Sequence, residues 1–96
     1  SWATGVLELA HGVAKELVTQ ADLDKYGWVF LHITNGLTSE YADFSHDSAV
    51  GADDVICRVM AGKSALFYTA NIDELHAKAT AATAGTLYLE YAILEV

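Results

Sequence analysis

The stretch WVFLHITNGLTSEYADF, residues 28–44, decides the first expectation about the fold. Its first part, residues 28–34, is rich in β-branched and aromatic side chains, which favour a strand. Asn35-Gly36 follows, and this pair is preferred in a two-residue type I′ turn because both central positions need positive φ. The sequence therefore predicts a β-hairpin whose second strand covers residues 37–44. The nearly apolar first strand is expected to be an interior strand of a sheet, and the second is expected to have one solvent-exposed face or edge.

The C-terminal stretch TLYLEYAILEV, residues 86–96, predicts another long strand. Successive residues of a strand point to opposite faces, and apolar side chains dominate both faces here. Such a strand is expected in the centre of a sheet, or with a partner against its second face. A shorter strand is expected over residues 64–70 (SALFYTA).

Residues 2–19 show the spacing of an amphipathic helix. Gly5 and Gly12 fall at the edge of the apolar arc, where each weakens a helix, so a close approach of neighbouring backbone is expected there. The arc is broader than packing on one sheet requires, which suggests contact with a second surface. The apolar series is Trp2, Val6, Leu9, Val13 and Leu17.

A second helix is expected to begin at Asn71. Glu74, three residues later, completes a capping box, and Gly85 suits a left-handed helix stop. Residues 52–61 are ambiguous, because their apolar spacing fits a helix while their β-branched residues also fit a strand. The helix is the favoured interpretation of this segment.

The expected order of elements is α-β-β-α-β-α-β, or α-β-β-β-β-α-β if residues 52–61 are extended. Either order gives an α+β fold, with helices packed on a single mixed or antiparallel sheet of four to five strands. A chain of 96 residues without proline or an evident linker is expected to form one domain, residues 1–96. Its hydrophobic fraction of 53% is sufficient for a core and excludes disorder.

The chain is acidic, with 13 acidic against 5 basic side chains and a formal charge of −8. This charge disfavours direct binding of nucleic acids and of anionic membranes, and it is compatible with a basic protein partner. No apolar run approaches the roughly 18 residues of a membrane span, and no signal peptide is recognisable. Cys57 is the single cysteine and cannot form an internal disulfide, so a reducing, cytoplasmic setting is expected.

The candidates for catalysis are His32, His46 and Asp43. His32 shares one face of its strand with aromatic residues, as in an aromatic-lined pocket, but a histidine bonded to backbone at a sheet edge gives the same pattern. His46 and Asp43 belong to the acid-rich region from residue 40 to residue 54. Such oxygen-rich regions suit hard cations, yet the spacing matches no metal-binding motif. Neither a metal nor a cofactor is expected.

Several aromatic residues are candidates for an interface, because each combines a large apolar area with a polar tip. They are Trp2, Tyr41, Tyr88 and Tyr91. The final strand and the wide N-terminal arc carry more apolar side chain than a domain of this size is expected to cover. A homo-oligomer, in its simplest form a homodimer, is therefore expected.

Three functions remain open. The first is a small non-enzymatic binding or assembly module, expected to be homodimeric. The second is a domain that binds a small molecule, or an enzyme, with a pocket around His32. The third is an acidic inhibitor that mimics nucleic acid or blocks a basic cleft, using the acids between Glu40 and Asp54. The first is favoured, and enzymatic activity is not.

Overall fold

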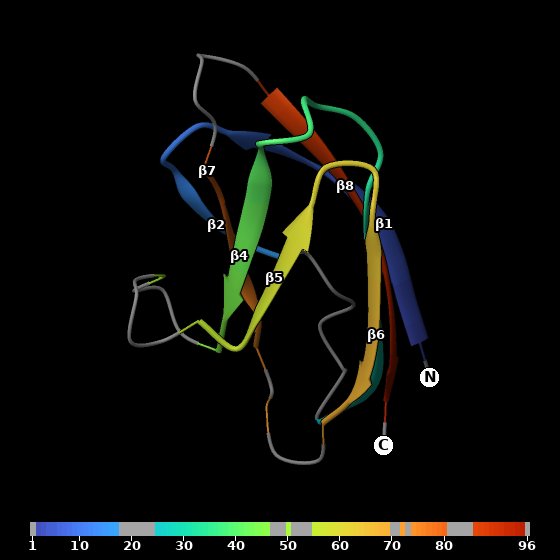
Figure 1. Cartoon of the computed structure of the whole chain (residues 1–96). Helices are drawn as coiled ribbons and strands as arrows, with labels where there is room; N and C mark the ends of the chain where they lie inside the picture. Colours follow the sequence, from blue (N-terminus) through green and yellow to red (C-terminus); the bar gives the residue numbers. More distant parts are fainter. Residues whose placement is uncertain are drawn as a thin grey trace.

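The chain folds as two packed antiparallel β-sheets in a computed structural model (Figure 1). The structure describes residues 2–17, 25–46, 50, 55–69, 72, 74–80 and 86–95. Within these ranges there are eight strands and no helix. The strands are β1 (Trp2–Ala10), β2 (Ala14–Glu16), β3 (Tyr26–Ile33), β4 (Tyr41–Ser45), β5 (Cys57–Met60), β6 (Ser64–Tyr68), β7 (His76–Thr80) and β8 (Thr86–Glu95).

The strand order is that of a jelly roll. Sheet A has the order β1-β8-β3-β6, and sheet B has the order β2-β7-β4-β5. Strands from the first half of the chain pair with strands from the second half in reverse order, β1 with β8, β2 with β7, β3 with β6 and β4 with β5. Eight strands wound into two sheets in this way are the jelly-roll form of a β-sandwich.

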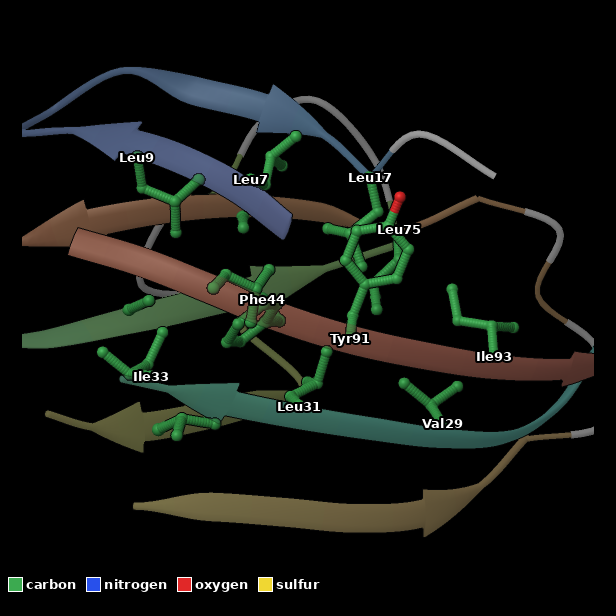
Figure 2. Packing of buried hydrophobic residues seen from close by; sticks show 14 of the residues in the cluster. Leu7, Leu9, Leu17, Val29, Leu31, Ile33, Phe44, Leu75, Tyr91 and Ile93 are labelled. Atoms are coloured by element: carbon green, nitrogen blue, oxygen red, sulfur yellow. The ribbon is translucent and has the colours of Figure 1, made fainter. Parts of the chain in front are cut away.

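The core lies between the two sheets, where the inward-pointing residues of both sheets meet (Figure 2). Every second residue of the longer strands is buried, as the period of a strand requires. Sheet A supplies most of the large aliphatic side chains, and Phe44 and three alanines, Ala42, Ala77 and Ala79, come from the centre of sheet B. The inward residues of β3 and β8 are Val29, Leu31, Ile33, Leu87, Leu89, Tyr91 and Ile93.

Tyr91 fits into the core because its partner in β1 is a glycine. Gly5 lies directly opposite Tyr91 in the β1–β8 register. A Cβ atom added to Gly5 would lie 2.6 Å from Tyr91 Oη and 2.8 Å from Tyr91 Cζ, well inside van der Waals contact. The expected close approach of neighbouring backbone to a helical Gly5 is wrong, because Gly5 lies in a strand and the group that approaches it is a core side chain of β8. Burial of the ring raises the pKa of Tyr91, and the neighbouring Tyr26 raises it further.

The α+β prediction is wrong, first of all in the segment 2–19. Its described residues form β1 and β2 instead of a helix. Trp2 and Val6 point outward with exposed fractions of 61% and 65%, whereas Leu9 points inward and is fully buried. Apolar side chains on both faces of β1 therefore produced a series that imitated helical spacing. Residues 18 and 19 lie outside the described residues.

The second expected helix is also wrong, because its described part contains β7. Ala77 and Ala79 are buried against the core, and the residues between and beside them face away from it. Pairing with β2 on one side and β4 on the other outweighs the helix propensity of the alanines. Asn71 and Gly85, the expected ends of that helix, lie outside the described residues. In the ambiguous segment 52–61, the extended alternative is correct for β5.

The predicted hairpin is wrong because β3 and β4 belong to different sheets. Among the described residues, only glycines have positive φ, so Asn35 does not occupy a type I′ turn; Gly36 has a φ of 110°. The Asn35 side chain instead pairs with β8. Its Nδ2 donates to the Thr86 carbonyl at 2.9 Å, and its Oδ1 accepts from the Tyr88 amide at 2.7 Å. Asn35 thereby lengthens the β3–β8 ladder beyond the end of β3.

Three strand predictions are confirmed. β3 and β8 lie in the interior of sheet A, as their apolar sequences indicated, and β6 lies within the predicted segment 64–70. All paired strands of both sheets are antiparallel. A search of the described residues for a helix with the length and apolar character needed to cross a membrane finds none.

Candidate functional site

Large apolar side chains gather on the outer face of sheet A, the face directed away from the core. They come from all four strands, because strand alternation brings the outward residues of β1, β8, β3 and β6 to one side. Their exposed fractions lie between 39% and 66%. We call this surface the apolar face; its members are Trp2, Val6, Trp28, Phe30, Leu66, Tyr68 and Leu94.

Strand register arranges these side chains in rows across the sheet. The row at one end of the sheet contains the pairs Trp2–Leu94 and Trp28–Tyr68, and the β3–β8 register is irregular there, between Tyr26 and Val29. The next row runs through Thr4, Ala92, Phe30 and Leu66, which are successive partners in β1, β8, β3 and β6. These two rows contain no ionisable acid or base, so they form an uncharged band across the sheet.

The exposed area of the apolar face is large for a domain of 96 residues. From the exposed fractions, its seven side chains present on the order of 700 Å² to solvent. The largest apolar patch of a typical monomer is about 300–600 Å² and is often functional. Trp28 and Tyr68 meet edge to face, with ring centroids 5.3 Å apart and an interplanar angle of 71°. The Trp28–Tyr68 pair therefore forms a ridge, whereas the rings of Phe30 and His32 lie nearly parallel, with centroids 6.5 Å apart and an interplanar angle of 22°.

A polar row borders the apolar face and contains His32, the first candidate for catalysis. His32 points away from the core and is half-buried. Its Nδ1 lies 2.8 Å from Ser64 Oγ and 3.1 Å from the Lys63 carbonyl oxygen. The imidazole is thus held against β6, as expected for a histidine bonded at a sheet edge. Glu90 is the β8 partner of His32 in this row.

The outer face of sheet B is polar and internally paired. Arg58 donates from Nε to Asp43 Oδ1 at 2.7 Å and from Nη2 to Asp43 Oδ2 at 3.1 Å. The Arg58 guanidinium carbon also lies 3.9 Å from the centre of the Tyr41 ring. The hydrogen bonds to Asp43 raise the pKa of Arg58. Asp43, a second candidate for catalysis, is therefore engaged in an ion pair, and His46 is exposed just beyond β4.

The acid-rich region does not form a single cluster in its described part. Glu40 is 5% exposed, and its Oε1 accepts a hydrogen bond from the Leu37 amide at 2.6 Å. Asp43 lies on the outer face of sheet B, bound to Arg58. The remaining acids of the region lie outside the described residues; they are Asp47, Asp53 and Asp54. The described acids of this region thus serve a loop and an ion pair.

The four predicted interface residues occupy three different places. Trp2 and Tyr88 are exposed on the outer face of sheet A, 61% and 39% respectively. Tyr41 lies beneath Arg58 on sheet B, and Tyr91 is buried in the core. Sequence reasoning did not select the other large residues of the apolar face. The signal for them was present in β3 and β8, which are apolar on both sides.

Cys57 is half-buried in β5, opposite Phe44 of β4. Burial raises the pKa of its thiol, and the negative charge of Asp43 raises it further. Little thiolate is present at neutral pH, and the thiolate is the reactive form of cysteine. Cys57 therefore lacks the electrostatic surroundings of a nucleophile.

No family model matches the chain, and no curated protein matches it. A solved structure from Bacillus endospore appendages, a family of disulfide-linked pili, is similar to it. The two share 17% sequence identity with a TM-score of 0.51, and the match covers 100% of this chain and 88% of the other. At this level of identity the likeness concerns the fold alone.

Proposed function

We propose that this domain is a non-enzymatic assembly module that associates with copies of itself through the apolar face. The observation that carries the proposal is the uncharged band of Trp2, Trp28, Phe30, Leu66, Tyr68 and Leu94 on the outside of sheet A. Exposing on the order of 700 Å² of mostly apolar side chain to water is unfavourable, and a partner that covers it is stabilised by the hydrophobic effect.

The negative charge of the chain favours contact between two copies through the apolar face. Two chains of formal charge −8 repel one another, so contact is least opposed where the facing surfaces carry no charge. The two rows that form the uncharged band meet this condition. The area also suits a self-complementary contact, because a standard interface buries about 800 Å² per partner.

The shape of the apolar face suits a sheet of another chain. Sheets pack about 10 Å apart with interdigitated side chains, and the edge-to-face pair of Trp28 and Tyr68 leaves ridges for such packing. We therefore expect two copies to pack their A sheets face to face, related by a two-fold axis.

The structural neighbour supports assembly as a use of this fold, since it comes from appendages that are pili. The pili are described as disulfide-linked. The 96 residues here contain one cysteine, and one thiol joins at most two copies. Cys57 lies in β5 of sheet B, so the proposed contact through sheet A does not use a disulfide.

Sedimentation velocity over a wide range of concentrations tests the proposal, with the variant Leu66→Glu and the matched control Met60→Glu. Leu66 is 66% exposed on the edge strand of sheet A, and Met60 is 37% exposed on the edge strand of sheet B. Both variants are expected to fold, because both side chains reach solvent. The native chain and Met60→Glu should associate, and Leu66→Glu should remain monomeric. A native chain that stays monomeric throughout, or a Leu66→Glu variant that associates like the native chain, would refute the proposal.

A further inference from the structure

Three metal-donor side chains converge where edge strand β2 joins β7. Glu16 is the last residue of β2 and lies directly opposite His76, the first residue of β7. Glu74 precedes His76 by two residues, and the intervening Leu75 is fully buried. In an extended chain, residues two apart point to the same side. Glu74 and His76 therefore face outward together, beside Glu16.

The donor atoms are close enough to share one ion. His76 Nε2 lies 3.1 Å from Glu74 Oε2, and one ligand atom from each of the three residues lies within 4.8 Å of the others. Ligand atoms about 2.1 Å from a tetrahedral metal are about 3.4 Å apart. Glu16 is exposed, so its side chain has room to adjust.

The electrostatics of the cluster favour a cation. Two carboxylates meet one imidazole whose side chain is 11% exposed. Within the described part of the chain, neither carboxylate forms an ion pair with a lysine or arginine. Lys15, next to Glu16 in sequence, directs its Nζ to the backbone carbonyl of Glu8 at 3.3 Å. The negative charge of the cluster is therefore not neutralised by a basic side chain.

We infer that Glu16, Glu74 and His76 form a binding site for a divalent transition-metal ion, with Zn²⁺ as the representative. One imidazole and two carboxylates are a donor set that Zn²⁺ accepts, and three protein ligands leave a fourth position for water. A metal ion bound here joins β2 to β7. β2 has only three residues, all of them exposed, so a metal ion that links it to β7 would stabilise this short edge strand.

Isothermal titration of the chelator-treated chain with Zn²⁺ tests the site, using Glu16→Gln and Glu74→Gln with Glu8→Gln as the matched control. Glu8 is exposed on β1 and lies outside the cluster. We expect one ion per chain, an affinity at least about tenfold weaker in the first two variants, and unchanged affinity in Glu8→Gln. The imidazole nitrogen resonances of His76 should shift on addition of Zn²⁺. Equal affinities in all three variants, or Zn²⁺ binding without a shift at His76, would overturn the inference.

Discussion

The two outer faces of the sandwich differ although the sheets have the same number of strands and share one core. On sheet B, the outer face carries charged side chains, among them the Asp43–Arg58 pair over Tyr41 and the carboxylates of Glu16 and Glu74 at its β2 edge. On sheet A, the equivalent positions carry apolar side chains such as Trp28 and Leu66. Sheet B therefore presents a charged and polar outer face, whereas sheet A keeps an apolar surface that folding does not cover. The proposed assembly through the apolar face rests on this difference.

The largest effect is expected from comparing the two sides of sheet A with the same substitution. Leu31→Ala removes a fully buried side chain and should lower the free energy of unfolding by about 2–5 kcal/mol. Leu66→Ala removes an exposed side chain and should change it by less than about 0.5 kcal/mol in the monomer. Urea unfolding at low protein concentration measures both. Similar losses in the two variants would mean that the apolar face is already covered within one chain.

A smaller loss of stability is expected when the contact between Gly5 and Tyr91, on the inner face of sheet A, is disturbed. Gly5→Ala places a methyl group against the ring of Tyr91 and should cost about 1–3 kcal/mol of unfolding free energy. The cost should shrink when the same substitution is made in a Tyr91→Leu background, because the clash disappears with the ring. Thermal unfolding of the native chain, the two single variants and the double variant measures the coupling energy between positions 5 and 91. An unchanged cost in the second background would assign the effect to strand propensity instead.

Salt should distinguish an apolar contact from a charged one. If copies associate through the apolar face, added NaCl screens their mutual repulsion and should tighten association severalfold between low salt and about 1 M. Contact through the charged face of sheet B would weaken under the same conditions. Sedimentation equilibrium at several salt concentrations measures the trend. Dissociation at high salt would contradict association through the apolar face and would indicate a contact between charged surfaces.

The smallest effect concerns Cys57, which reports on the electrostatics of sheet B. Asp43→Asn removes the negative charge beside the thiol and should lower the pKa of Cys57. That pKa should stay above its ordinary value, because burial is the larger cause of the increase. The ultraviolet absorbance of the thiolate as a function of pH measures the change, with Glu8→Asn as the control. A higher pKa in Asp43→Asn would contradict the assigned cause.

The strands that could be predicted from the sequence are those with strong local signals. β3 and β8 combine β-branched and aromatic residues with apolar side chains on both faces, and both occupy the interior of sheet A. β1 was mistaken for a helix for the same physical reason. Because Trp2 and Val6 point to solvent while Leu7 and Leu9 point inward, the sequence of β1 lacks the apolar–polar alternation of a half-buried strand, although its burial alternates.

The candidate site was predictable only in part. Trp2 and Tyr88 were selected, and the surplus of apolar side chain in β8 pointed to a second covered surface. Bringing Leu66 and Tyr68 beside Trp28 requires the pairing of β3 with β6, which are separated by more than thirty residues. The Asn35-Gly36 pair indicated a hairpin locally, but long-range pairing placed β3 and β4 in different sheets. Long-range strand pairing is the information that local patterns lack.

Both tryptophans of the chain, Trp2 and Trp28, lie on the apolar face, so their fluorescence tests the central claim directly. The measurement is acrylamide quenching of tryptophan emission across a series of protein concentrations. If a second copy covers this face, quenching should fall and the emission maximum should move to shorter wavelength as concentration rises. Quenching that remains the same from the most dilute to the most concentrated sample would contradict the claim.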